Sequence, residues 1–120
     1  MANIGDSFKA KLKDVHLGWG IVSKDGTRHR DPYEAYIPLK SKIATKYDLI
    51  NDGTEFNVTG QDFKIKFTGK QHDKIHGKNL SSSGDLTLLG KYLKDDLELK
   101  PGDAVKVKFV SENEVSINKL

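Results

Sequence analysis

The sequence predicts a mainly β fold with two helices, built as a sheet or barrel of mixed or antiparallel strands. Apolar and polar residues alternate in several short runs, which is typical of strands with one buried face. Only two segments carry apolar residues at helical spacing. Strand and helix patterns do not alternate regularly along the chain, which argues against a doubly wound parallel sheet.

In the first half of the chain, residues 8–12 alternate apolar and lysine side chains, as a half-buried strand does. Residues 33–39 are expected to form a second strand, entered and left through prolines. Ser41 is placed to cap a short helix that ends near Leu49. The Asn-Asp-Gly sequence at 51–53 indicates a turn.

The second half repeats these signals, with a hairpin expected first and a pair of strands at the end. Between them, Asp85 is placed to cap a helix that carries Leu86, Leu89, Leu93 and Leu97 on one stripe. The Lys-Pro-Gly-Asp sequence at 100–103 indicates a turn. The strands expected in this half are 56–58, 63–67, 105–109 and 115–117. The pattern therefore predicts six or more short strands and two helices.

Length and composition favour one domain that spans residues 1–120, because 120 residues can bury a single core. The chain has no cysteine, which excludes disulfides, thiolate metal sites and a cysteine nucleophile. No apolar run approaches the ~20 residues needed to span a bilayer, and the N-terminus lacks an apolar signal core. We expect a cytoplasmic protein with no membrane partner. No phosphate-binding glycine loop or zinc-finger spacing is present, so we expect no cofactor.

Positive charge is concentrated in two blocks, although the net charge is only +3. Residues 1–47 hold nine lysines and arginines against five acidic residues, and residues 61–80 hold five against two. The intervening residues 48–60 hold three acidic residues and no basic one. Clustered positive charge attracts polyanions, so one interpretation is a polyanion-binding surface. The simpler interpretation, which the composition alone favours, is a solvated surface with many lysines.

Each basic block contains a long polar stretch, at 15–31 and at 69–84, and long irregular segments in compact domains are usually functional or disordered. The chain has eighteen lysines but only two arginines, and both arginines lie in the first stretch. Arginine suits bidentate contacts with phosphates and guanine, and amide side chains suit base edges. The candidate residues are Trp19, Lys24, Arg28, His29, Arg30, Glu34, Lys70, Gln71, His72, Lys74, His76, Lys78 and Asn79.

Two further interpretations of the sequence, a metal site and a nuclease site, are weaker than the interpretation as a polyanion-binding surface. His72 and His76 are spaced as metal ligands on a helix, but Gly77 argues against a helix there and no third ligand is evident. Asp52, Asp62 and Lys64 are spaced as in magnesium-dependent nucleases, a spacing expected by chance in a chain this rich in charge. We therefore expect a binding protein and not an enzyme.

Several segments together resemble the C-terminal recognition domain of NgoFVII-type and BfiI-type restriction endonucleases. The resemblance spans roughly residues 15–110. The matching segments are Gly-Trp-Gly at 18–20, Arg-Asp-Pro-Tyr-Glu-Ala-Tyr-Ile-Pro at 30–38, Gly-Lys-Asn-Leu at 77–80, Leu-Leu-Gly-Lys-Tyr-Leu at 88–93 and Leu-Glu-Leu at 97–99.

The resemblance implies a DNA-binding pseudobarrel, a seven-stranded open barrel also used by plant auxin-response-type transcription factors. It implies two arms that enter the major groove of double-stranded DNA, which would be the two polar stretches. The function implied is sequence-specific target recognition in a restriction-modification system, with a nuclease domain or subunit as a possible partner. A protein-interaction or anti-restriction module with the same barrel, or a magnesium nuclease at Asp52, Asp62 and Lys64, are the alternatives.

Overall fold

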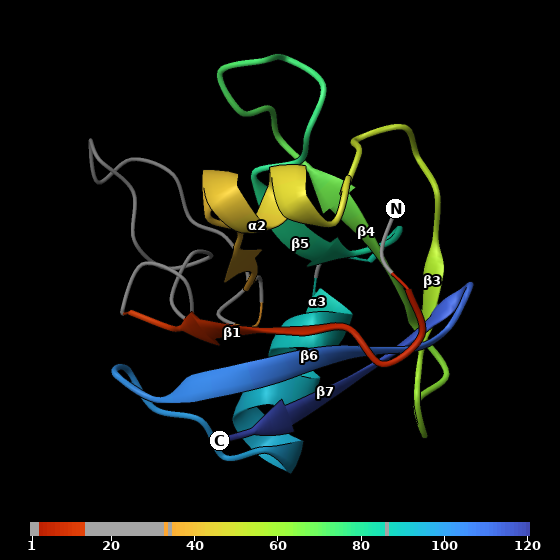
Figure 1. Ribbon diagram of the computed structural model, residues 1–120. Helices are drawn as coiled ribbons and strands as arrows, with labels where there is room; N and C mark the ends of the chain where they lie inside the picture. Colours follow the sequence, from red (N-terminus) through yellow and green to blue (C-terminus); the bar gives the residue numbers. More distant parts are fainter. Residues whose placement is uncertain (1–2, 14–32, 34, 86) are drawn as a thin grey trace.

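The computed structural model describes residues 3–13, 33, 35–85 and 87–120, and its main feature is a seven-stranded mixed sheet (Figure 1). The strands are β1 (Ser7–Lys11), β2 (Ile37–Pro38), β3 (Phe56–Val58), β4 (Lys64–Thr68), β5 (Asn79–Ser82), β6 (Ala104–Ser111) and β7 (Glu114–Lys119). Their order is β1-β6-β7-β3-β4-β5-β2, with β3 and β7 parallel and the other neighbours antiparallel. Among the described residues no pairing joins β1 to β2, so the barrel is open, as expected of the pseudobarrel.

Two helical segments cover the curved sheet (Figure 1). They are α2 (Ser41–Lys46) and α3 (Thr87–Lys91), and α3 continues as a π-helical turn, η1 (Tyr92–Asp96). The hydroxyl of Tyr47, which follows α2, donates to the carbonyl of Ser7 in β1 at 3.1 Å. The hydroxyl of Tyr92 donates to the carbonyl of Ile117 in β7 at 2.6 Å. Each helical segment is thereby tied to a strand distant in the sequence.

None of the helices in the described ranges is long and apolar enough to cross a membrane.

The core lies between the sheet and α3, and its side chains come from the alternating positions of the strands. Phe56 packs edge-on against Phe67 and Phe109, with ring centroids 5.5 Å and 6.1 Å apart. The largest fully buried side chains include Leu12, Ile37, Ile65, Leu80, Leu89, Leu93 and Ile117. Burial of these side chains supplies the main stabilisation of the fold.

Gly90 in α3 allows the helix to approach the backbone of Tyr33. A Cβ atom at Gly90 would lie 1.6 Å from the carbonyl oxygen of Tyr33. The hydroxyl of Tyr33 also donates to Asp95 at 3.2 Å, and the ammonium of Lys94 lies 5.7 Å from the centre of the Tyr33 ring. Tyr33 lies two positions after the end of the first polar stretch in the sequence, so α3 and η1 hold the chain in place just beyond that stretch.

One of the two expected helix caps is confirmed and the other is wrong. Asp85 caps α3, because its Oδ1 accepts hydrogen bonds from the backbone and the hydroxyl of Thr87 at 2.9 Å and 2.6 Å. The expected cap at Ser41 is wrong, since Ser41 is the first helical residue and Lys40 precedes it without a side-chain cap. The α-helix expected from Asp85 to Leu97 changes to π-helical hydrogen bonding at Tyr92.

Two strand expectations are also corrected. The strand expected at 33–39 is reduced to β2, which ends at Pro38 as expected, and Pro38 pairs with Asn79 of β5. The polar stretch at 69–84 contains β5, which the polar composition concealed. Ser82 is fully buried, and its hydroxyl donates to the carbonyl of Asp85 at 2.8 Å. Polar side chains that find such partners can occupy a buried strand.

Candidate nucleic-acid interface

Residues 69–78, which connect β4 to β5, form a loop that stands clear of the barrel (Figure 1). We call this loop the 69–78 arm. Its two ends are joined as strands, because the backbone amide of Lys78 donates to the carbonyl of Thr68 at 2.8 Å. The arm therefore rises from a paired, rigid base.

Hydrogen bonds within the arm fix its shape. The amide of Gln71 donates to the carbonyl of His76, and the amide of Lys74 donates to the carbonyl of Gln71, both at 2.9 Å. Oδ1 of Asp73 accepts from the amides of Ile75 and His76 at 2.9 Å and 3.0 Å. Lys74 has a left-handed backbone, with φ of 61°, at the tip of this turn. Ordered polar loops of this kind can hold side chains ready for a ligand.

Further contacts attach the arm to the barrel. Nε2 of Gln71 donates to the carbonyls of Leu39 and Gly77 at 3.0 Å and 3.2 Å. Nδ2 of Asn51 donates to the carbonyl of Gly69 at 2.9 Å. A Cβ atom at Gly77 would lie 2.8 Å from Cβ of Phe67, so glycine allows the returning chain to pack against β4.

His76 holds the arm to the end of α2 through two carboxylates. Its Nδ1 contacts Asp73 of the arm, and its Nε2 lies 2.8 Å from Oδ1 of Asp48. The hydrogen bonds with Asp73, and then those with Asp48, raise the pKa of His76 above its ordinary value of 6.5. Hydrogen bonds from His76 and from the amide of Ile75 lower the pKa of Asp73 to about 2. Only a doubly protonated imidazole can donate to both carboxylates, so this clamp is strongest when His76 is charged.

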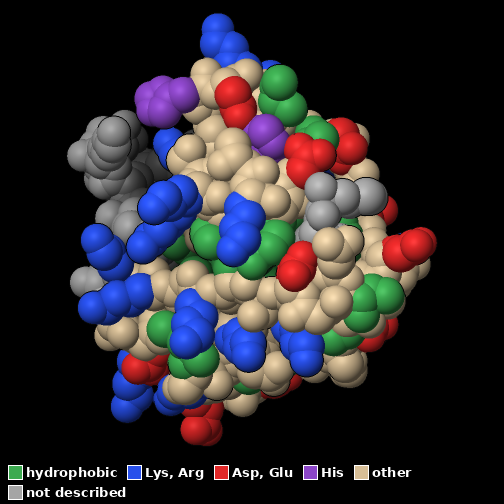
Figure 2. All heavy atoms as spheres, in the orientation of Figure 1, with side chains coloured by type: hydrophobic (Ala, Val, Ile, Leu, Met, Phe, Trp, Pro, Cys, Tyr) green, Lys and Arg blue, Asp and Glu red, His purple; other side chains and the backbone are tan. Residues whose placement is uncertain are grey.

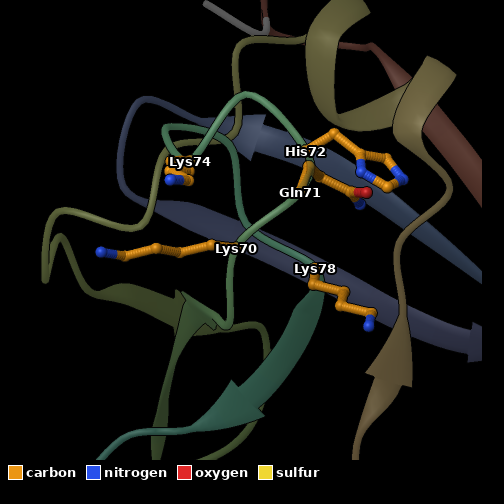
Figure 3. A pocket seen from close by; sticks show the side chains of 5 residues that line it. All are labelled: Lys70, Gln71, His72, Lys74 and Lys78. Carbon is orange, nitrogen blue, oxygen red and sulfur yellow. The ribbon is translucent and has the colours of Figure 1, made fainter.

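Five of the predicted residues line one open pocket of about 590 Å³ on the arm: Lys70, Gln71, His72, Lys74 and Lys78 (Figure 3). Lys70, His72, Lys74 and Lys78 are exposed. In Figure 3, Lys70 extends to one side of the arm and Lys78 to the other. Among the described residues that line this pocket none is acidic, so its electrostatic character suits an anion.

The remaining predicted residues are placed differently. His76 and Gln71 use hydrogen-bonding atoms to hold the arm in place, and Asn79 lies in β5 opposite Thr68 and Pro38. The first-stretch candidates lie outside the described residues: Trp19, Lys24, Arg28, His29, Arg30 and Glu34.

Sequence reasoning missed Ile75 on the arm. This side chain is 54% exposed, although isoleucine is usually buried. The signal available was a single large apolar residue inside a polar, basic stretch. An exposed apolar side chain next to Lys74 can contact the methyl group of a thymine.

The structure lends no support to the metal-binding alternatives in the part of the chain that it describes. No group of three or more potential metal ligands occurs among those residues. The carboxylate of Asp52 accepts a hydrogen bond from the amide of Thr54 at 2.9 Å, and hydrogen bonding with Thr54 lowers the pKa of Asp52. Lys64 is exposed on β4, as a solvated strand residue is.

Comparison with known proteins identifies the family. The family model of the NgoFVII C-terminal B3-like DNA-binding domain matches residues 7–114, which include both polar stretches, strands β1 to β6 and the first residue of β7. A search of curated proteins and a search of solved structures each found no match. The open seven-stranded barrel and its basic arm agree with the family match. The chain therefore belongs to the family of the NgoFVII C-terminal B3-like DNA-binding domain.

Proposed function

We propose that this domain recognises a specific sequence in double-stranded DNA through two arms that enter the major groove. The observation that carries the proposal is the ordered 69–78 arm, with its exposed basic side chains, on a barrel of a DNA-binding family. The second arm of the pair is the first polar stretch, which contains both arginines. Target recognition within a restriction-modification system is the role that the family supports best.

The residues divide into two kinds of contact. Lys70, Lys74 and Lys78 have no rigid fork of donors, so they are suited to phosphates, which supply affinity without reading sequence. Arg28 and Arg30 are suited to bidentate contacts with guanine, and Ile75 is suited to a thymine methyl. In this proposal Gln71 and His76 act mainly by holding the arm in place.

A selection from randomised duplexes, followed by sequencing, tests the proposal directly. We expect one short motif to be enriched at low salt. The enriched duplex then allows the affinities of variants to be compared with those on an unrelated duplex. Failure to enrich or shift any duplex would reject sequence-specific binding, and enrichment of single strands alone would reject major-groove recognition.

Two variants separate phosphate contacts from base contacts. Lys78→Ala is expected to weaken binding to all duplexes equally and to reduce the slope of log affinity against log salt by about 0.9. Arg28→Ala is expected to lose about 1–3 kcal/mol on the selected duplex and much less on others. Lys91→Ala, an exposed lysine at the end of α3, is the control and is expected to bind as the wild type does. Equal losses from Arg28→Ala on every duplex would show that Arg28 contacts only phosphate.

A further inference from the structure

A second basic surface lies on the outer face of β1 and β6, away from the 69–78 arm. The strand register places Lys9 directly opposite Lys106, with Lys11 and Lys108 two residues further along their strands on either side of this pair. All four side chains are exposed, while Phe8, Ala10, Val105 and Val107 between them are buried. Figure 2 shows lysine side chains gathered over these strands, on the face turned to the viewer. We call these four residues the lysine face.

The lysine face lacks the opposite charges that usually balance such a pattern. Like charges directly opposite on neighbouring strands destabilise a sheet. The next strand, β7, contributes only Ser116 and Asn118 opposite Lys108 and Lys106. Its acidic residue, Glu114, instead accepts a hydrogen bond from Thr59 at 2.8 Å. None of the four lysines forms an ion pair with another described residue. A repulsive arrangement of this kind is relieved when a polyanion binds.

The spacing of the lysine face suits a phosphate backbone. Alternate residues of a strand lie roughly 6.6 Å apart, so the four ammonium groups rise from a row about 13 Å long. Duplex DNA carries one negative charge per about 1.7 Å of its axis, so several phosphates lie within this length. A small multivalent anion would reach fewer of the four lysines.

The lysine face is also connected to the arm by a basic helix. α2 lies between them, because Tyr47 at its end bonds to Ser7 of β1 while Asp48 bonds to His76 of the arm. Lys42 and Lys46 of α2 are exposed. In Figure 2, blue side chains continue upward from β1 and β6 toward the arm.

We propose that the lysine face binds the phosphate backbone of duplex DNA outside the segment that the arms read. This inference rests on the proposed function, because the arms define which segment is read. The duplex bound there is the flank of the recognised duplex, because α2 connects the lysine face to the arm by a continuous basic surface. The lysine face would add affinity and salt dependence without adding sequence preference.

The test compares two lengths of the selected duplex. The short probe contains only the enriched motif, and the long probe adds about ten base pairs on each side, or roughly 34 Å of helix. We expect the wild type to bind the long probe more tightly and with a steeper salt dependence. Lys9→Gln/Lys106→Gln should leave binding to the short probe unchanged and lower the salt slope on the long probe by about 1.8, or 0.9 for each lost phosphate contact.

A control variant with the same change of charge is Lys91→Gln/Lys100→Gln, on exposed residues outside the lysine face. Equal behaviour of the two double variants on the long probe would overturn the inference, while binding of the short probe would still support the arms. Absence of wild-type binding to any duplex would overturn the proposed function and the inference together. Capture of a labelled duplex by protein already bound to an immobilised one, lost in Lys9→Gln/Lys106→Gln while the long probe gains nothing over the short one, would show that a second duplex binds the lysine face and would overturn its assignment to the flank.

Unfolding in denaturant checks that the variant is folded. Removal of both opposed like charges should leave the midpoint of Lys9→Gln/Lys106→Gln equal to or above that of the wild type. If the midpoint falls, Lys9→Arg/Lys106→Arg, which keeps both charges, is the second variant. It should keep the salt slope of the wild type on the long probe, and loss of that slope would overturn a role for charge.

Discussion

At the residue scale, Gly90 shows how a missing side chain allows a helix and a distant backbone segment to pack closely. Replacement of a helical glycine by alanine normally stabilises a helix by about 1 kcal/mol. Here the added Cβ would lie 1.6 Å from the carbonyl oxygen of Tyr33, so α3 or the Tyr33 backbone must move. We therefore predict that Gly90→Ala lowers the free energy of unfolding by about 1–3 kcal/mol, the usual cost of overpacking.

The midpoint of urea unfolding measures this change. Lys91→Ala, on the neighbouring exposed residue, is the control and is expected to shift stability by no more than about 0.5 kcal/mol. A Gly90→Ala protein as stable as the wild type would mean that α3 does not press on Tyr33.

Single residues also mark the limit of what the sequence predicts about the site. Lys70, His72, Lys74 and Lys78 could be grouped in advance because they share one polar stretch. The structural role of His76 could not, because its partner Asp48 lies 28 positions earlier in the chain. The same holds for the bond from Gln71 to Leu39, 32 positions away. Contacts within a stretch follow from composition, whereas contacts across the fold require the topology.

At the scale of elements, the strands with alternating apolar residues were predictable and β5 was not. β1, β4, β6 and β7 confirm the alternation, because every second side chain faces the core. β5 has the sequence Asn-Leu-Ser-Ser, and its buried serines are tolerated because Thr68 and Asp85 supply hydrogen-bond partners. The polarity of a segment therefore does not predict whether it is buried when its polar side chains find hydrogen-bond partners in neighbouring elements.

The arm is the element whose stability should depend on pH. Its clamp, His76, has a pKa raised above 6.5 by Asp73 and Asp48. The stabilisation is fully present below pH 6.5, the value of an unperturbed histidine, and is lost as pH rises through the higher pKa of the folded state. Asp73 stays charged in this range because its pKa is lowered to about 2.

We predict that His76→Gln loses stability relative to the wild type at pH 6 and that the difference shrinks by pH 9, in line with this titration. Denaturant unfolding at both pH values, with amide hydrogen exchange across the arm, measures it. His72→Gln is the matched control, because His72 is an exposed histidine on the same arm that is not part of the clamp. A loss for His76→Gln that is the same at both pH values would show that the clamp does not require a charged imidazole.

At the scale of the whole molecule, the barrel is open, and tyrosines in or next to the helical segments bond to the edge strand β1 and to the inner strand β7. The strand order leaves β1 and β2 at opposite ends of the sheet in the described part of the chain. Tyr47 ties the end of α2 to β1, and Tyr92 ties η1 to β7. Burial raises the pKa of Tyr92, so its hydroxyl remains a hydrogen-bond donor at neutral and moderately alkaline pH. The 69–78 arm connects β4 and β5 of the sheet to which these contacts attach the helical segments.

These two hydroxyls give a last prediction, for the stability of the whole barrel. Tyr92→Phe and Tyr47→Phe should each lower the free energy of unfolding by about 0.5–1.5 kcal/mol, because a partly buried carbonyl loses its donor. The double variant should lose the sum, since the two bonds share no residue and act at different helices. Tyr33→Phe, which removes an exposed 3.2 Å bond to Asp95, should lose less. Urea unfolding of all four variants measures these differences. A loss in the double variant that is much greater than the sum would show that the two helical segments stabilise the open barrel cooperatively.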